Sequence, residues 1–336
     1  MVMLSEWISG YRTRFGRSPD VVCIFTRNTE ANFRACLLHL SARMSVPRQI
    51  LPGTTYMISR RCSQRQFLLA PTAYTKQVFL YCMAVAAERT GVVIHAVTVM
   101  SNHYHLIATD PRGCLPDFCG WLHEFVAKAL NSRYGRWENF WTSEPTSYVR
   151  LVDADAVLQK TIYTVANPVA AGLVSHSQQW PGVCLFSPGR RRVERPVGFF
   201  RAKGSTPAVA TMHVVTAPVG LSSHDGYLLV RNELAKHEAH LRSQAREAGR
   251  PFLGVQGVLA QKTTAMPSAI EPRRQVSPKI ACRNQWRRAE TLQRCKQFIH
   301  LYRRAVRAWK QRLNDIIFPA GTYQMARRYE VMVAPS

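Results

Sequence analysis

Residues 92–109 read VVIHAVTVMSNHYHLIAT, and this stretch decides the fold. It holds two apolar runs, VVIHAVTVM and HYHLIAT, separated by the polar pair Ser101-Asn102. Valine, isoleucine and threonine favour strands, and a short polar pair favours a turn. The stretch therefore predicts two neighbouring strands joined by a tight turn.

Strand and helix patterns alternate on both sides of this pair. The predicted elements are, in order, a strand at 54–59 (TTYMIS), a helix at 72–89, the two strands above, a helix at 115–134, a strand at 147–152 (SYVRLV) and a helix at 156–167. The last helix is expected to begin after Asp153 and Asp155 and to stop at Pro168. This order predicts an α+β fold, a ferredoxin-like antiparallel sheet with helices on one face and one added helix.

The chain is strongly basic: Lys and Arg number 45 against 20 Asp and Glu, a formal net charge of +25 over 336 residues. Because each neutralised phosphate releases condensed counterions, this excess favours a nucleic-acid partner. A membrane surface is the competing polyanion, and a soluble protein whose charge only aids solubility is the plain alternative. The longest apolar run, 78–87, is too short to span a bilayer, so we expect no membrane partner.

The nine cysteines are odd in number and form no C-x-x-C pair. This usage favours reduced thiols and a cytoplasmic protein, which we expect on the nucleoid. Cys114, Cys119 and His123 are an imaginable zinc set, but they share an amphipathic helix pattern and lack a fourth ligand at a usual spacing. Core packing is therefore their expected role.

Composition divides the chain into three parts. Residues 1–43 lack sustained periodicity and are interpreted as a dispensable leader, with Met44 as a natural start. Residues 44–182 carry the alternating pattern described above. The remainder, 183–336, is predicted to be a basic, mostly helical extension, with linkers at 189–196 (GRRRVERP) and 267–277 and a charged helix at 225–246.

A long basic helix is predicted within 273–312, where Glu290 is the only acid. Its apolar residues recur at steps of three and four and so share one face, namely Leu292, Cys295, Ile299, Tyr302, Val306, Trp309 and Leu313. Such a helix can dock on the main domain, act as a nucleic-acid arm or form a helical dimer contact. Both a monomer and a homodimer stay open.

Four side chains form the candidate site. His103 and His105 alternate on a predicted strand, so both imidazoles point from the same face, where they can chelate one divalent ion. Tyr163 and Asn167 are one helical turn apart and share a helix face. Taken singly, each has an ordinary structural role, the histidines in a strand, the tyrosine in a core and the asparagine at a helix end.

From about residue 44 to 182 the chain resembles the single-tyrosine HUH transposases, most closely the REP-associated tyrosine transposases. The resemblance is carried by Asn102-His103-Tyr104-His105-Leu106, by Tyr163 with Asn167-Pro168 four residues later, by the following V-x-A-G-L-V, and by Phe140-Trp141 and Trp180-Pro181. The chain departs from the family pattern at Tyr104, which is less apolar than usual, and at Ala170, where the family commonly has Arg.

The resemblance implies that Tyr163 is a nucleophile and that His103, His105 and Asn167 hold Mg²⁺ or Mn²⁺. It implies cleavage and rejoining of single-stranded or hairpin DNA, such as repetitive palindromic elements, through a 5′-phosphotyrosine intermediate. Arginines and aromatics suit phosphate contact and base stacking, and the expected DNA contacts are Arg60, Arg61, Arg65, Arg133, Arg136 and Trp137. Two other functions stay open, a rolling-circle initiator or relaxase-like nickase and a catalytically inert, domesticated hairpin-DNA-binding protein.

Overall fold

The strand pair of residues 92–109 forms the centre of a larger sheet in the computed structural model, which describes residues 47–199, 206–268 and 279–335. Strand β2 (Val93–Val99) pairs antiparallel with β3 (His103–Asp110). Strand β1 (Thr54–Arg61) pairs antiparallel with β3 on one side and with β4 (Ser147–Leu151) on the other. The resulting spatial order β2-β3-β1-β4 is ferredoxin-like and confirms the predicted α+β fold.

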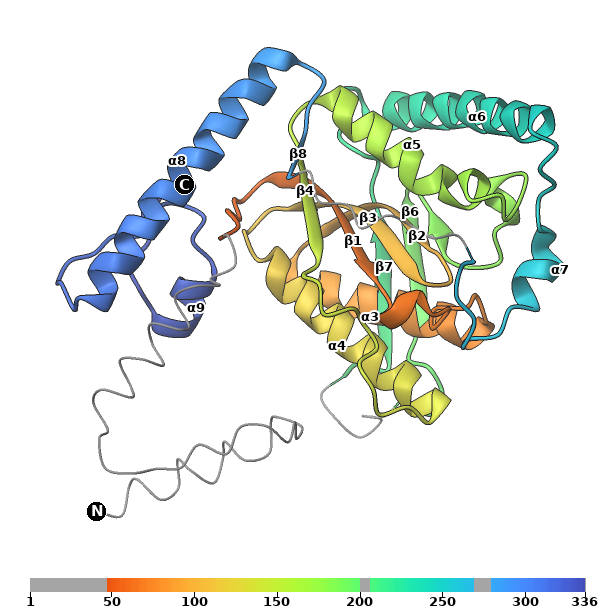
Figure 1. The fold of residues 1–336 in the computed structure, drawn as a ribbon, viewed down its shortest axis with the longest axis horizontal. Helices are drawn as coiled ribbons and strands as arrows, with labels where there is room; N and C mark the ends of the chain where they lie inside the picture. The colour runs from red at the N-terminus through yellow and green to blue at the C-terminus, as the bar shows by residue number, and fades with distance from the viewer. Residues whose placement is uncertain (1–46, 200–205, 269–278, 336) are drawn as a thin grey trace. The chain divides into compact units, whose positions relative to one another are not determined.

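Two helices cover one face of this sheet, as Figure 1 shows. Helix α3 (Ala73–Thr90) begins where the side chain of Thr72 caps the amide of Thr75, and it ends at Gly91, whose φ is 75°. Helix α4 (Leu115–Tyr134) ends at Gly135 with a φ of 60°. Glycine accepts these left-handed angles without a Cβ penalty, which explains why both helices stop where the sequence predicts.

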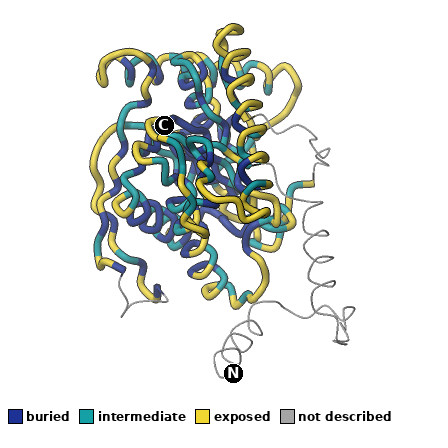
Figure 2. The backbone as a smooth tube through the Cα atoms, turned by 90° about the vertical axis from the view of Figure 1, so that its left-hand side faces the viewer, coloured by how far each residue is buried: buried dark blue, intermediate teal, exposed yellow. Residues whose placement is uncertain are grey.

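The added helix α5 (Ala154–Ala170) covers the opposite face together with α6 (Ser223–Glu247). Because side chains alternate along a strand, Tyr104 and Leu106 join the core under α3 and α4, whereas Ile107 joins the core under α5. His103 and His105 share the parity of Ile107. The buried stretches are therefore gathered in the central strands and the inner sides of the helices (Figure 2).

Helix α5 differs from its predicted length at the C-terminal end. The prediction that Pro168 stops the helix is wrong, because Pro168 lies inside it and the helix continues to Ala170. A proline lacks one amide proton, so in the last turn it removes a single hydrogen bond and the turn can still close. The amide of Ala171 donates to the carbonyl of Asn167 at 2.9 Å, and the chain turns at Gly172, whose φ is 70°.

The GRRRVERP segment is not a linker, contrary to prediction. It forms β6 (Gly189–Glu194), which pairs antiparallel with β7 (Val209–Val214), and β7 in turn pairs with β2. Exposed arginines are tolerated on such an edge strand, where they also discourage pairing with another chain. The short strands β5 (Cys184–Leu185) and β8 (Ile280–Ala281) join β2 and β4.

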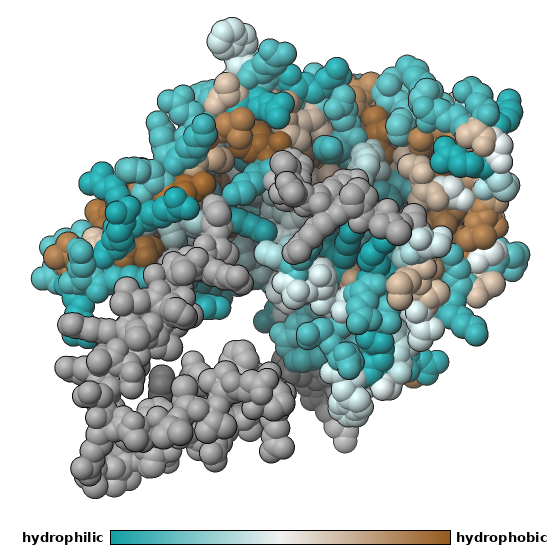
Figure 3. Space-filling view, in the orientation of Figure 1, coloured by the Kyte–Doolittle hydropathy of each residue, from teal (hydrophilic) through white to brown (hydrophobic). Residues whose placement is uncertain are grey.

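The C-terminal region carries α7 (Gly254–Leu259), α8 (Gln285–Lys310) and α9 (Gln324–Tyr329). Helix α8 is the predicted basic helix, and Figure 3 shows a largely hydrophilic surface over it with hydrophobic residues between. In the predicted apolar stripe Val306 is buried, whereas Leu292, Trp309 and Leu313 are exposed. Cys295, Phe298 and Ile299 line a pocket with Tyr56 and Tyr148, so α8 docks on the sheet.

Asp153 ties the start of α5 to the segment before α8. One carboxylate oxygen accepts the amide of Ala156 at 2.8 Å and caps α5. The other accepts the amides of Arg283 at 2.8 Å and Asn284 at 3.1 Å. Short 3₁₀ turns are formed by η1 (Ser63–Arg65) and η2 (Ser177–Gln179).

The remaining predictions concern the leader, the second linker, a membrane span and the Cys119 and His123 side chains. The leader at 1–43 lies outside the described residues, as does most of the linker at 267–277, and the boundary at 182 stays a prediction. Within the described ranges, no helix is long and apolar enough to cross a membrane. Cys119 and His123 are buried on α4, in agreement with a packing role.

Candidate active site

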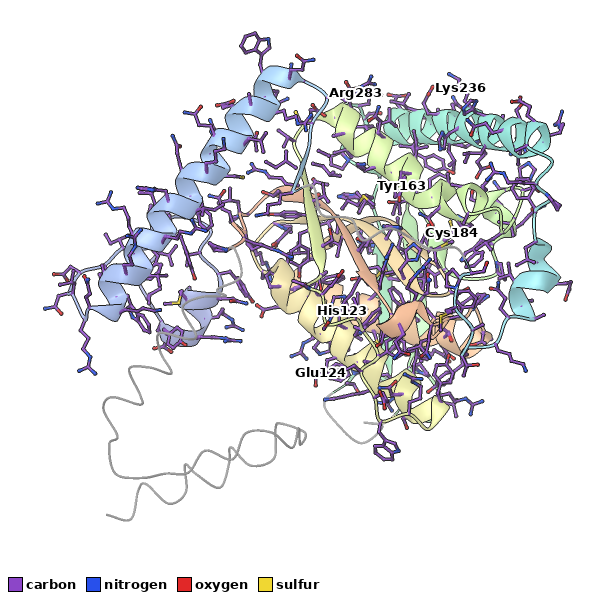
Figure 4. The ribbon with its side chains drawn as sticks, in the orientation of Figure 1. His123, Glu124, Tyr163, Cys184, Lys236 and Arg283 are labelled. Atoms are coloured by element: carbon purple, nitrogen blue, oxygen red, sulfur yellow. The ribbon has the colours of Figure 1, made fainter. Side chains whose placement is uncertain are left out.

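The predicted nucleophile and the predicted histidine pair meet on the α5 face of the sheet. The ring centroids of His103 and His105 are 4.9 Å apart, and the Tyr163 ring lies 5.3 Å from that of His105 at an interplanar angle of 74°. Tyr163 extends from α5, as Figure 4 labels it, and 44% of its surface is exposed. The phenol therefore stands at the boundary between the imidazoles and solvent.

The orientation of His103 is fixed by its neighbour in the sequence. Its Nδ1 lies 2.7 Å from the side-chain oxygen of Asn102, whose amide nitrogen donates to the carbonyl of Arg65 at 3.2 Å. Because that oxygen can only accept, Nδ1 donates this hydrogen bond. A metal ion would then bind through the other ring nitrogen, Nε2.

His105 is buried, and its Nδ1 has no hydrogen-bond partner among the described residues. Burial lowers the pKa of this imidazole well below its ordinary value of 6.5, and the nearby positive groups His103, Arg61 and Lys160 lower it further. His105 is therefore neutral at pH 7. A neutral imidazole is the form that coordinates a metal.

The donor set at this site fits a divalent cation with open positions. The structure brings the two imidazoles together, and Asn167 is placed by its position on α5, half-buried and one turn after Tyr163. No group of three or more His, Cys, Asp or Glu side chains able to hold a metal occurs in the described parts of the chain. A cation bound here would thus take its remaining ligands from an amide, water or a phosphate oxygen.

Two of the predicted DNA contacts lie beside this site. Arg61 is the cross-strand partner of His103 and is exposed. Arg65 follows in the η1 turn and accepts the side chain of Asn102 through its carbonyl. Both arginines therefore lie at the end of the sheet where β1 ends and β3 starts with His103.

Arg60 points to the other face of the sheet. Its guanidinium donates to Nδ1 of His123 at 2.7 Å and lies 5.6 Å from the centre of the Trp141 ring. Since Nδ1 accepts, Nε2 of His123 carries the proton and donates to the hydroxyl of Tyr104 at 2.6 Å. The Tyr104 ring is fully buried, so it packs behind the sheet as expected. Arg60 is not brought together with the histidine pair.

The remaining predicted contacts lie in the last turn of α4 and in the loop after it. Trp137 is 99% exposed, and the guanidinium of Arg133 lies 5.4 Å from the centre of the Tyr74 ring. Arg136 is half-buried, with its Nε unpartnered among the described residues. This loop returns to the site end of the sheet, because the amide of Ser63 donates to the carbonyl of Phe140 at 2.9 Å.

Lys160 is a member of the site that the sequence prediction missed. It lies three residues before Tyr163 on α5, and its Nζ is 5.5 Å from the centre of the Tyr163 ring. The spacing of three residues is the signal that could have found it, because side chains three apart share a helix face.

No protein-family model matches the chain, and no curated protein matches it. Solved structures similar to it include a REP-associated tyrosine transposase bound to a REP hairpin, at 18% identity and a TM-score of 0.34, covering 42% of this chain and 81% of that one. A candidate transposase from Deinococcus radiodurans R1 is similar at 18% identity and a TM-score of 0.25, covering 32% of this chain and 85% of that one. At these TM-scores the two likenesses add nothing to what the fold and the site geometry establish.

Proposed function

We propose that this protein is a transposase-type enzyme that cuts and rejoins DNA strands, with Tyr163 as its nucleophile. The observation that carries the proposal is the approach of the Tyr163 ring to within 5.3 Å of His105, from an element distant in the sequence. An exposed tyrosine beside a pair of imidazoles is an arrangement suited to attack on a phosphodiester. The motif resemblance of residues 44–182 supports the same class.

The proposed reaction is a phosphoryl transfer that conserves the energy of the phosphodiester. The Tyr163 oxygen forms a bond to phosphorus while the bond from phosphorus to the 3′-oxygen breaks. The phenolic proton passes to solvent, and the departing 3′-oxygen takes up a proton to become a hydroxyl. The products are a 5′-phosphotyrosine link and a free 3′-OH, and the reverse attack by a 3′-OH rejoins a strand without ATP.

The chain's own residues divide the work of this step. A phenol is a weak nucleophile at neutral pH, so the phosphorus must be made easier to attack. His103, His105 and Asn167 are the proposed ligands of Mg²⁺ or Mn²⁺. A divalent ion held there would draw charge from a nonbridging phosphate oxygen and make phosphorus easier to attack.

The proposed substrate is single-stranded or hairpin DNA. A strand outside a duplex can bring its backbone to a tyrosine that protrudes from a helix face. Arg61 and Arg65 beside the site suit phosphate contact, and the exposed Trp137 suits base stacking. A location on the nucleoid and a monomeric or homodimeric state belong to the same proposal.

The deciding experiment is the formation of a covalent adduct. The purified full-length chain would be incubated with Mn²⁺ and radiolabelled palindromic DNA that flanks its own gene. Label that stays with the protein through denaturing electrophoresis and maps to Tyr163 supports the enzyme. Tight hairpin binding without any adduct would instead identify an inert hairpin-binding protein, and nicking of supercoiled plasmid in preference to hairpins would favour a rolling-circle nickase.

A further inference from the structure

Lys160 places a positive charge at the reaction centre. Its Nζ lies 5.5 Å from the Tyr163 ring, and the side chain is half-buried, so its position is limited by packing. The Tyr163 ring lies in turn 5.3 Å from the His105 ring, so the lysine charge and the histidine pair lie on either side of the same tyrosine. Lys160 therefore acts on both the nucleophile and the proposed metal ligands.

The surroundings of the histidine pair are positive. Arg61 is the cross-strand partner of His103 and is exposed. No carboxylate pairs with Lys160 in the described ranges, and no acidic side chain completes a metal-binding group there. Most divalent-cation sites use carboxylates to offset the charge of the ion. Two imidazoles and an amide offer no such offset.

A cation entering this centre alone would meet two like charges. A unit charge within several ångströms of a divalent ion changes its affinity on the order of tenfold even with strong solvent screening. In a strand-cutting enzyme, the DNA phosphate can supply the negative charge that offsets the cation. That group can bridge between a cation and a lysine, because it carries two nonbridging oxygens.

We propose that Lys160 is a phosphate-binding residue of the reaction centre, and that its charge makes divalent-cation binding at His103 and His105 depend on the DNA phosphate. The inference rests on the proposed function for the identity of the phosphate. Cation and DNA then bind cooperatively, and each raises the affinity for the other by the same factor.

The test measures Mn²⁺ affinity on the full-length protein, without catalysis. Electron paramagnetic resonance would count free Mn²⁺ with and without oligothymidylate, a single strand of neutral sequence. For the natural chain, the oligonucleotide should tighten Mn²⁺ binding about tenfold or more. Lys160→Gln should bind Mn²⁺ about tenfold more tightly in the absence of DNA and should lose most of the tightening that DNA causes.

A matched control is Lys236→Gln. Lys236 lies on α6, where it is exposed and pairs with Glu233 at 2.7 Å, and Figure 4 labels it. This variant removes the same charge from the chain and should bind Mn²⁺ as the natural protein does. His103→Ala should abolish the measured binding and so locate it.

Three results would overturn the inference. They are an Mn²⁺ affinity of Lys160→Gln equal to that of Lys236→Gln, an Mn²⁺ affinity that DNA does not change, and Mn²⁺ binding that His103→Ala leaves intact. Failure of the proposed function has a different signature. Cooperative Mn²⁺ and DNA binding without a Tyr163 adduct would support the role of Lys160 and remove strand cleavage.

Discussion

The two faces of β3 are built in opposite ways, although neighbouring residues supply them. Toward α4, Tyr104 is joined to His123 at 2.6 Å and His123 to Arg60 at 2.7 Å, behind a fully buried ring. Toward α5, Nδ1 of His105 and the hydroxyl of Thr164 are buried with no partner among the described residues, beside a tyrosine that is 44% exposed. The α4 face carries a chain of hydrogen-bonded side chains in which only Nε of Arg60 lacks a partner among the described residues, whereas the unpartnered atoms of the α5 face lie beside the exposed Tyr163.

Under the proposed function, the α4 face supports the sheet and the α5 face carries the reaction. A buried polar atom without a partner costs about 1–3 kcal/mol, so such atoms are rare unless a ligand or a reaction accounts for them. Changes on the α5 face should therefore remove activity and spare the fold. Changes on the α4 face should do the reverse.

The largest expected effect is that of Tyr163→Phe. This change removes the attacking oxygen and keeps the ring, so adduct formation should fall by at least about 10³-fold while hairpin binding stays within about twofold. Denaturing electrophoresis and a binding titration would measure the two quantities. Tyr329→Phe, an exposed tyrosine on α9, is the control and should keep full activity. Full cleavage by Tyr163→Phe would remove this residue from its role.

The next effect in size is the loss of an imidazole. His103→Ala and His105→Ala should each lower cation-dependent cleavage by about 10²-fold or more and leave the circular dichroism spectrum unchanged. His213→Ala, on the exposed side of β7, should behave as the natural chain does. Normal cleavage in the presence of EDTA would contradict the metal assignment.

Lowering the pH should destabilise the fold, because buried histidines lie on both faces of the sheet. Burial lowers the pKa of His95, and it lowers that of His105 and His123 well below 6.5. In the unfolded chain these groups take up protons near pH 6.5, whereas in the folded chain they do so only at lower pH. The folded state is thus fully stabilised above about pH 6.5 and loses stability as pH falls below it.

The size of this loss is about 1.4 kcal/mol per pH unit for each histidine that stays neutral in the folded state. Urea unfolding at several values between pH 7.5 and pH 5 would measure the slope. His123→Gln should show a shallower slope than the natural chain. A free energy of unfolding that is flat over this range would mean that the three imidazoles are not kept neutral.

The smallest expected effect on activity belongs to Tyr104→Phe. The change keeps the buried ring and leaves Nε2–H of His123 without an acceptor, which should lower the free energy of unfolding by about 1–3 kcal/mol. Adduct formation at saturating cation should change only a few-fold. A severe loss of adduct at unchanged stability would place Tyr104 with the reacting face and break the comparison.

Much of the central fold follows from local patterns. Polar and glycine boundaries define 92–109 and both flanking helices, because glycine at 91 and 135 is needed for left-handed turns. The meeting of Tyr163 with His105 also follows from the order of the elements together with the motif. The order alone does not determine which side of α5 faces the sheet, because that orientation depends on how α5 packs against the second apolar face of the sheet.

Other features depend on contacts that no local pattern reveals. Strand β6 contains three consecutive arginines and no apolar alternation, so only its pairing with β7 identifies it as a strand. Arg60 and Arg61 have the same residue type, but strand parity sends one to His123 and the other to the partner position of His103. Lys160 was missed because its role depends on charge around a site rather than on a motif.

The carboxylate of Asp153 has a practical consequence for dissecting the molecule. Because it holds the first turn of α5 and the amides of Arg283 and Asn284 at once, the helix that bears Tyr163 shares an anchor with the start of α8. A chain shortened before residue 279 would lose the basic helix α8 and also two of the hydrogen bonds that Asp153 accepts at the start of α5, the helix that bears the proposed nucleophile. Truncation therefore cannot separate the effect of the charge on α8 from the effect of a loosened α5. Charge-reversing substitutions on α8 would change the charge alone.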